Sequence, residues 1–354
     1  MALIAKRLAR LASGVALAAS LVFGAGSAMA QEKKVRVQMA GAFPSSMGIL
    51  GPAQLRTVDL IKKLSNGSID IRFFEPGALV PGSQYFDAVS NGSLDMAYTA
   101  AGYFTGKDIA FAMFTTVPFG PGAGEYMAWY EYGGGNELMK EMHAKYNIVA
   151  LNCGLQPPEG SGWFRKEIKT LDDLKGLKMR FFGLGANVMQ KLGVATQLLQ
   201  AGEIFQALQL GTIDATEFSM PTMDLTLGFY QVAKFYYFPG WHQQTSVGQV
   251  YISQKKWAEF SDHQKIVVEQ ACKAQMLQEF AEAEALQFGA MKELQAKGVQ
   301  FKNWSPEIMA ALEAKWQEVV AEESAKSPNF KKVWASYSEF RKNYKIWSDY
   351  GYLK

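Results

Sequence analysis

The residues best suited to bind a charged ligand lie between positions 176 and 218. Arg180 ends the short run GLKMR, and Glu217 ends the similar run TIDATE; both runs are typical of short strands. A helix-like segment, residues 204–210, precedes the second run and stops at Gly211. In an open α/β sheet, ligands bind beyond the carboxyl ends of the strands. We therefore expect Arg180 and Glu217 on one edge of a sheet, where the planar guanidinium is suited to hold a carboxylate.

The elements that must position these residues alternate between strands and helices. Strands are predicted at residues 35–41, 68–77 and 94–100, and helices at residues 52–64 and 83–90. Strands separated by helices indicate parallel sheet units rather than a sandwich. The predicted fold class is therefore α/β.

A weak internal repeat relates residues 85–98 to residues 204–217. The matched pairs are Phe86 and Phe205, Ala88 and Ala207, Gly92 and Gly211, Leu94 and Ile213, and Asp95 and Asp214. Each copy reads as a helix, a glycine stop and a strand. Two related α/β halves would place Tyr98 and Glu217 opposite each other across a cleft. The alternative is a chance similarity of two such units.

The predicted domains follow from this repeat. Residues 31–153 with about 245–260 form one α/β domain, and residues 154–244 form the other; strands at 147–155 and 247–253 cross between them as a hinge. A capping box at Ser261 opens a helix that reaches about Lys297, and proline at the first helical position marks two more helices, beginning at Ser305 and Ser327. This region, residues 261–354, is expected to pack on the second domain or on a dimer partner, because its end is rich in Tyr and Trp.

The first thirty residues have the pattern of a secretory signal. They combine a basic start, an apolar stretch at residues 11–23 and the ending Ala28-Met29-Ala30, which predicts cleavage before Gln31. A retained membrane anchor is the alternative, although the apolar stretch is short for a bilayer span. Three of the 36 basic residues and none of the 33 acidic ones lie in this segment, so the mature chain is balanced in charge. We expect a periplasmic protein.

Composition argues against several classes of function. No basic stripe suggests nucleic-acid binding. Three histidines without a CxxC motif make a structural zinc site improbable. No Ser-His or Cys-His arrangement indicates an enzyme, and Asp95, Glu159 and Asp214 read as turn or surface groups. The two cysteines, Cys153 and Cys272, are either one disulfide in an oxidising compartment or two buried thiols.

Three motifs carry a family resemblance: TLDDLKGLKMR (residues 170–180), GEIFQALQLGTIDATE (202–217) and LGFYQVAKFYYFPGW (227–241). Together they resemble the DctP-type solute-binding proteins of TRAP transporters, and most closely the branch that binds 2-oxo monocarboxylates with a metal cation. The resemblance implies a type II-like periplasmic binding protein with two α/β domains. Such a receptor closes on an organic acid, delivers it to the small and large membrane permease subunits, and catalyses no reaction.

The resemblance also implies site residues. Arg180 would bind the carboxylate, while the Gln156 side chain, the Glu217 carboxylate and the Phe218 backbone carbonyl would hold sodium or calcium, which take oxygen ligands. A simple Arg180–Glu217 ion pair across the cleft is an alternative, as is a solvated hinge position for Gln156. Further candidate pocket residues are Tyr98, Tyr103, Phe182, Trp241 and His242.

Two departures from the branch affect the predicted pocket. Phe218 stands where tryptophan is usual, and His242 stands where another aromatic residue is common. A longer 2-oxo acid, lactate or an aromatic 2-hydroxy acid is therefore also a candidate ligand. Two other functions stay open: an organic-acid-binding protein that serves a sensor kinase or an ABC importer, and an exported hydrolase.

Overall fold

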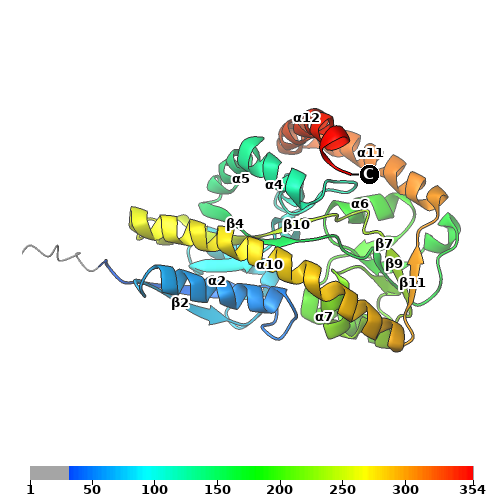
Figure 1. Ribbon diagram of the computed structural model, residues 1–354, viewed down its shortest axis with the longest axis horizontal. Coiled ribbons are helices and arrows are strands. Elements are labelled where there is room, and N and C mark those ends of the chain that lie inside the picture. The colour runs from blue at the N-terminus through cyan, green and yellow to red at the C-terminus, as the bar shows by residue number, and fades with distance from the viewer. Residues whose placement is uncertain (1–31, 354) are drawn as a thin grey trace, which may run out of the picture. The chain divides into compact units, whose positions relative to one another are not determined.

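The strands of the computed structural model, which describes residues 32–353, form two mixed sheets (Figure 1). The five-stranded sheet has the order β2 (Ile69–Phe74), β1 (Val35–Gly41), β3 (Met96–Thr99), β10 (Ser246–Ser253), β4 (Ile148–Gln156). The six-stranded sheet has the order β11 (Gln300–Asn303), β9 (Phe235–Phe238), β5 (Gly162–Phe164), β8 (Ala215–Thr216), β6 (Lys178–Arg180), β7 (Ala195–Gln197). The predicted α/β class is confirmed, and the predicted signal segment lies outside the described residues.

The five-stranded sheet is parallel at one edge and antiparallel at the other. Strand β1 pairs in parallel with β2 and β3, whereas β10 runs antiparallel between β3 and β4. All eight residues of β10 are buried, as expected for a strand covered on both faces. Strands β4 and β10 meet at their Gln156 and Ser246 ends, where the chain leaves this sheet for the other.

The six-stranded sheet brings Arg180 and Glu217 to the same edge. Strand β6 pairs in parallel with β8, with Arg180 opposite Thr216, and the Glu217 amide donates to the Arg180 carbonyl at 3.1 Å. The two residues therefore lie on neighbouring strand ends, as the sequence indicated, and not across a cleft from each other. Strand β8 has only two residues, fewer than the sequence pattern suggested.

The internal repeat has a counterpart in three dimensions. Gly92 and Gly211 both adopt left-handed φ, 76° and 75°, which glycine allows without a steric penalty. Asp95 accepts from the Gln38 amide at 2.9 Å, and Asp214 accepts from the Lys178 amide at 3.0 Å. The two copies thus dock on their own sheets in the same way, which argues against a chance similarity.

Helices cover both sheets. The α-helices are α2 (Leu50–Leu64), α3 (Tyr85–Ser90), α4 (Ala123–Tyr132), α5 (Gly135–Ala144), α6 (Leu184–Lys191), α7 (Ala201–Leu210), α8 (Pro221–Leu227), α9 (Gln254–Trp257), α10 (Asp262–Ala296), α11 (Pro306–Lys326) and α12 (Pro328–Gly351). Short 3-10 helices are η1 (Gly82–Gln84), η2 (Ala101–Phe104), η3 (Ile109–Phe114), η4 (Leu171–Leu174) and η5 (Phe229–Gln231). Within residues 32–353, none of the helices is both long and apolar enough to cross a membrane.

Helix α10 connects the two sheets. It begins at the predicted Ser261 capping box and runs past β4 and α2 (Figure 1), and it also packs against α8, which follows β8 of the six-stranded sheet. A disulfide between Cys153 and Cys272 attaches it to β4, so the alternative of two free thiols does not hold. Helix α11 packs on α6, whereas α12 turns back onto η3, α4 and α5 of the first half. The expected packing on the second domain or on a dimer partner thus fits α11 but not the buried face of α12 (Phe330, Val333, Tyr337), which covers the half built on the five-stranded sheet.

Candidate functional site

A small cavity lies where the two sheets meet, with about 40 Å³ accessible to the centre of a water molecule. The half built on the five-stranded sheet contributes apolar and hydroxyl groups, and the half built on the six-stranded sheet contributes both charged groups, Glu159 and Arg180. The lining residues are Phe43, Leu50, Ala100, Tyr103, Thr115, Gln156, Glu159, Arg180, Phe182, Phe218, Ser219, Gln243, Ser246 and Gly248. This volume suits a few water molecules or a small organic molecule.

Arg180 reaches the cavity from the end of β6 and is fixed by backbone and side-chain acceptors. Its Nε donates to the Leu199 carbonyl at 3.3 Å, and its Nη1 donates to the Glu217 backbone carbonyl at 2.7 Å and to Glu217 Oε2 at 3.1 Å. The guanidinium also lies over the Phe218 ring, 5.3 Å from its centroid. Nε and Nη1 make these three hydrogen bonds, and the third guanidinium nitrogen, Nη2, takes part in none of them.

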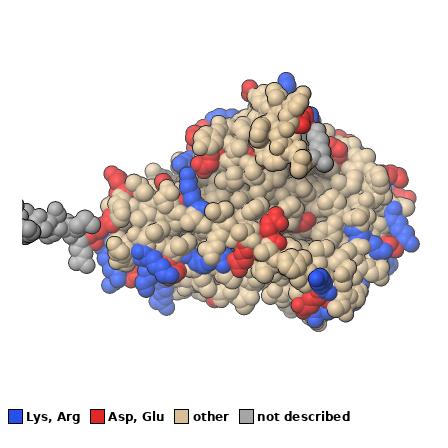
Figure 2. Space-filling view, in the orientation of Figure 1, with Lys and Arg blue, Asp and Glu red and all other residues tan. Residues whose placement is uncertain are grey.

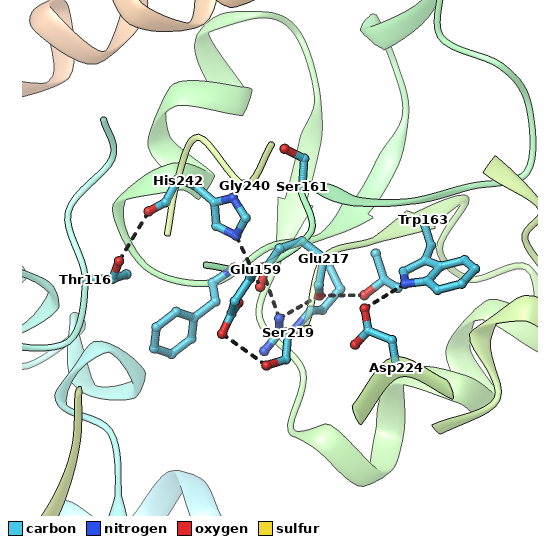
Figure 3. A network of polar contacts seen from close by, with 12 residues as sticks. Thr116, Glu159, Ser161, Trp163, Glu217, Ser219, Asp224, Gly240 and His242 are labelled. Atoms are coloured by element: carbon cyan, nitrogen blue, oxygen red, sulfur yellow. Dashed lines mark hydrogen bonds and ion pairs between the residues drawn. The ribbon is translucent and has the colours of Figure 1, made fainter. Parts of the chain in front are cut away.

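Glu217 is fully buried and belongs to a cluster with His242 and Glu159. Its Oε2 accepts from the Phe182 amide at 2.8 Å, while its Oε1 lies 3.6 Å from His242 Nε2. Burial by itself would raise the pKa of Glu217, but the Arg180 charge and the donors of His242 and Phe182 outweigh it and lower that pKa. The three side chains converge in Figure 3, and one ligand atom from each lies within 4.8 Å of the other two.

Glu159 is buried, and its interpretation as a turn or surface group is wrong. Its amide donates to the Gln243 carbonyl at 3.2 Å, and its Oε1 accepts from Ser219 Oγ at 3.0 Å. Gly240 permits this packing, because a Cβ there would lie 2.2 Å from the Glu159 carbonyl oxygen. Burial, reinforced by the charges of Glu217 and Asp224, raises the pKa of Glu159 well above its usual range.

The amide of Gln156 is held at both ends. Its Nε2 donates to Glu279 Oε1 of α10, and its Oε1 accepts from Ser246 Oγ at 2.6 Å. Glu279 in turn accepts from Gln275 and from the Tyr98 hydroxyl, each at 3.3 Å. Burial raises the pKa of Glu279 to about 7 against these hydrogen bonds. Gln156 is only 5% exposed, so it is not a solvated hinge residue.

The aromatic candidates divide into two groups. Tyr103, Phe182 and Phe218 line the cavity, and the rings of Tyr103 and Phe182 meet edge to face at 4.8 Å between the two halves. Burial raises the pKa of Tyr103, against the charge of Arg180. Tyr98 and Trp241 are buried outside the lining: the Tyr98 hydroxyl contacts Glu279, and the Trp241 ring packs between Phe119 and Phe181.

Sequence reasoning did not identify several polar residues of this site, namely Thr115, Glu159, Ser219, Gln243, Ser246 and Glu279. Glu159 follows Pro157-Pro158 and precedes Gly160, which is typical of an exposed loop. Ser219 directly follows the recognised pair Glu217-Phe218, and Gln243 follows His242, so extending each motif by one residue would have included both. Glu279 lies within a uniform helical pattern and has no comparable signal.

Comparison with known proteins identifies the family. The model of the bacterial extracellular solute-binding proteins, family 7 (DctP), matches residues 49–327. The chain belongs to the DctP family. The chain is also 35% identical over 314 residues to the monocarboxylate 2-oxoacid-binding periplasmic protein of Nostoc sp., covering 89% of this chain and 86% of the relative. The predicted family is therefore confirmed.

Solved DctP-family structures match the whole described fold. A TRAP transporter solute-binding protein from Bordetella bronchiseptica, a dimer with copurified calcium and picolinate, is 34% identical with a TM-score of 0.87; the match covers 89% of this chain and 94% of that one. A protein from Pseudoalteromonas atlantica with bound sodium and pyruvate is 32% identical with a TM-score of 0.86, over 90% and 97%. The expected α/β periplasmic-receptor fold is confirmed.

Proposed function

We propose that this chain is a periplasmic TRAP receptor for a small 2-oxo or 2-hydroxy monocarboxylate. The observation that carries this proposal is Arg180, a buried arginine that lines a small cavity at the carboxyl end of β6. With Nε and Nη1 engaged, Nη2 would donate to an incoming carboxylate. The relatives named for 2-oxoacids and for pyruvate share this fold and about a third of the sequence.

A cation, sodium or calcium, completes the proposed site. Calcium and sodium accompany small carboxylates in the Bordetella and Pseudoalteromonas proteins. The residues present here fit such a group, because the buried Glu217 Oε1 accepts no hydrogen bond among residues 32–353, and His242 Nε2 lies 3.6 Å from it. Gln156, Glu217 and the Phe218 carbonyl would hold the cation, which would supply positive charge to the carboxylate and 2-oxygen of the acid. Without that charge, Glu217 and the bound carboxylate would repel each other.

Closure of two lobes would enclose the acid and exclude water. We assign residues 31–153 with about 245–260 to one lobe and residues 154–244 to the other, with β4 and β10 as the hinge. Residues 261–354 connect the lobes through α10. The edge-to-face contact of Tyr103 with Phe182 would close the entrance, so the ligand would favour the closed population through contacts made only there.

The cellular setting follows from the same proposal. Residues 1–30 would direct export and be removed, and the closed receptor would deliver the acid to the small and large permease subunits. The protein would return its ligand chemically unchanged.

A homodimer would form through the exposed aromatic end of α12, where Trp347 is 58% and Tyr350 is 90% exposed.

Calorimetric titration tests this proposal. Protein that is unfolded and refolded to remove ligand would be titrated with pyruvate, a branched 2-oxo acid, lactate and succinate, in cation-depleted buffer and with added sodium or calcium. We expect cation-dependent binding of a monocarboxylate, and a weaker affinity of Glu217→Gln that added cation partly restores. Normal binding of the acid by Glu217→Gln in cation-depleted buffer would reject the hypothesis of a bridging cation. Binding of none of these acids would reject the receptor function.

A further inference from the structure

The apolar residues that line the cavity divide into two sets. The Phe182 and Phe218 rings lie beside Arg180, with their centroids 5.9 and 5.3 Å from the guanidinium carbon, so they enclose the end where the carboxylate would bind. The other apolar lining residues belong to the half built on the five-stranded sheet, and they are Phe43, Leu50 and Ala100. An acid held by Arg180 would therefore direct its hydrocarbon tail toward this second set.

The loop that carries Phe43 is fixed to helix α2. Gln54, a fully buried residue of α2, donates from Nε2 to the Phe43 carbonyl at 2.8 Å, and its Oε1 accepts from the Phe43 amide at 3.4 Å. Gly51 allows the loop to approach the helix, because a Cβ there would lie 2.5 Å from the Ser45 carbonyl oxygen and 2.6 Å from that of Pro44. The backbone of Phe43 therefore has little room to move away from a ligand.

The position of Leu50 is set by a strained residue before it. Ile49 has a φ of 61°, which is a rare and costly conformation for a β-branched residue. Such strain persists only where the surrounding structure enforces it. Helix α8, from the other half, supports this loop, because a Cβ on Gly48 would lie 3.5 Å from both Thr222 Cγ2 and Thr226 Oγ1. The loop is thus held between α2 and α8.

We propose that residues 43–50, termed the tail wall, limit the length of the acid and make the receptor selective for short-tailed acids such as pyruvate. The inference rests on the proposed receptor function and specifies its ligand. The cavity of about 40 Å³ holds about three or four water-sized groups, which a carboxylate, a 2-oxygen and a short tail would occupy. The smaller ring of Phe218 does not lengthen the tail end, because it lies beside the guanidinium.

A tail wall that yields to the ligand is the competing arrangement. In that case a longer tail would bury more apolar surface, and affinity would rise by about fourfold for each buried methylene. A fixed tail wall has the opposite effect, since an oversized tail has to displace packed side chains. The order of affinities in a series of 2-oxo acids therefore distinguishes a fixed wall from a yielding one.

The unsubstituted protein provides the first test. Ligand-stripped protein would be titrated calorimetrically with pyruvate, 2-oxobutanoate, 4-methyl-2-oxopentanoate and picolinate, with sodium and calcium both present so that neither cation is limiting. We expect pyruvate to bind at least about tenfold more tightly than 4-methyl-2-oxopentanoate or picolinate. Equal or tighter binding of either larger acid would overturn the inference.

Two variants change the tail end in opposite directions. Leu50→Ala should raise the affinity for 4-methyl-2-oxopentanoate relative to pyruvate by at least about tenfold, because it removes part of the tail wall. Ala100→Val should lower the affinity for 2-oxobutanoate relative to pyruvate by about tenfold, because it adds bulk there. Leu55→Ala is the matched control, because Leu55 also lies on α2 but is 42% exposed and does not line the cavity.

Ratios of affinities separate selectivity from a general loss of folded protein, which would weaken every acid alike. Unchanged ratios in variants that remain folded by circular dichroism, or a shift of the same size in Leu55→Ala, would overturn the inference. Binding of every 2-oxo acid with similar affinity would reject the tail wall and leave the receptor function in place. Binding of no acid by the unsubstituted protein would reject the receptor function itself.

Discussion

Arg180 Nη1 donates both to the backbone carbonyl of Glu217, at 2.7 Å, and to its carboxylate, at 3.1 Å. Both side chains are at most 1% exposed, so each charge depends on the other for compensation. The arginine proposed to bind the ligand is therefore also part of the folded core. Experiments on Arg180 must separate loss of binding from loss of stability.

Replacing Arg180 by alanine should affect both properties. We expect pyruvate affinity to fall at least about 100-fold, because a charged donor to the carboxylate is lost. The free energy of unfolding should fall by about 3–5 kcal/mol, because Glu217 remains buried without the guanidinium that compensates its charge. Calorimetric titration and urea unfolding measure the two effects. The double variant Arg180→Met with Glu217→Gln removes both charges and should recover much of the stability without recovering binding. Normal pyruvate binding by this double variant would reject Arg180 as the carboxylate ligand.

Gly102 offers a test of lobe closure. A Cβ at this position would lie 2.4 Å from the Phe182 ring, and Phe182 supplies all of its nearest contacts. Gly102→Ala should therefore weaken binding by about tenfold, through crowding in the closed state, with little change in stability of the ligand-free protein. Gly106→Ala is the matched control, because a Cβ there meets no atom within 4 Å. Equal affinities of the two variants would argue against closure at Phe182.

The Cys153–Cys272 disulfide should be a large contributor to stability. It closes a chain segment of 119 residues and connects β4 to α10. Replacing both cysteines by serine should lower the free energy of unfolding by about 2–5 kcal/mol, since the unfolded chain gains freedom. Reduction of the wild-type protein should reproduce this loss in urea titrations. If oxidised wild type and the double variant unfold at the same urea concentration, the bond is not formed in solution.

His143 should make the fold less stable in acid. Burial lowers its pKa from the usual value of 6.5 to about 4, because the charged imidazole is disfavoured in its apolar, aromatic surroundings. The unfolded chain therefore binds the proton first as pH falls. Stability is lost between about pH 6.5 and pH 4, by about 3 kcal/mol over the full window. Urea unfolding of wild type and His143→Gln at pH 7.5, 6 and 5 should show a weaker pH dependence in the variant. Parallel curves would contradict this account.

The proposed homodimer can be tested without disturbing the core. Truncation near Ser327 would remove Phe330, Val333 and Tyr337, which are buried against the first half. We instead predict that Trp347→Ser combined with Tyr350→Ser converts a dimer to a monomer in sedimentation velocity, because both side chains are largely exposed in the single chain. Pyruvate affinity should be unchanged. A dimer that persists in this variant would exclude the aromatic end as its interface.

Local patterns explain which parts of this fold were predictable. The boundaries of β1 and α10 follow from alternation, capping residues and helix length, which depend on neighbours along the chain. The face shown in Figure 2 has basic and acidic residues interspersed, as the equal numbers of basic and acidic residues in the mature chain suggested. Arg180 and Glu217 could be placed on one edge because each ends a strand. Strand β8 has only two residues because its length is set by its pairing with β5 and β6, and the sequence pattern does not reveal these partners.

The sequence by itself determined the α/β class, the internal repeat, the family and the positions of Arg180 and Glu217, because each is encoded in short contiguous patterns. Tertiary structure decided the burial of Glu159, the convergence of its carboxylate with Glu217 and His242, and the Cys153–Cys272 bond. These features depend on segments about 60 to 120 residues apart meeting at one place. A loop acid beside prolines looks exposed until the distant Gly240 and Ser219 pack against it, and only the packed chain supplies those neighbours.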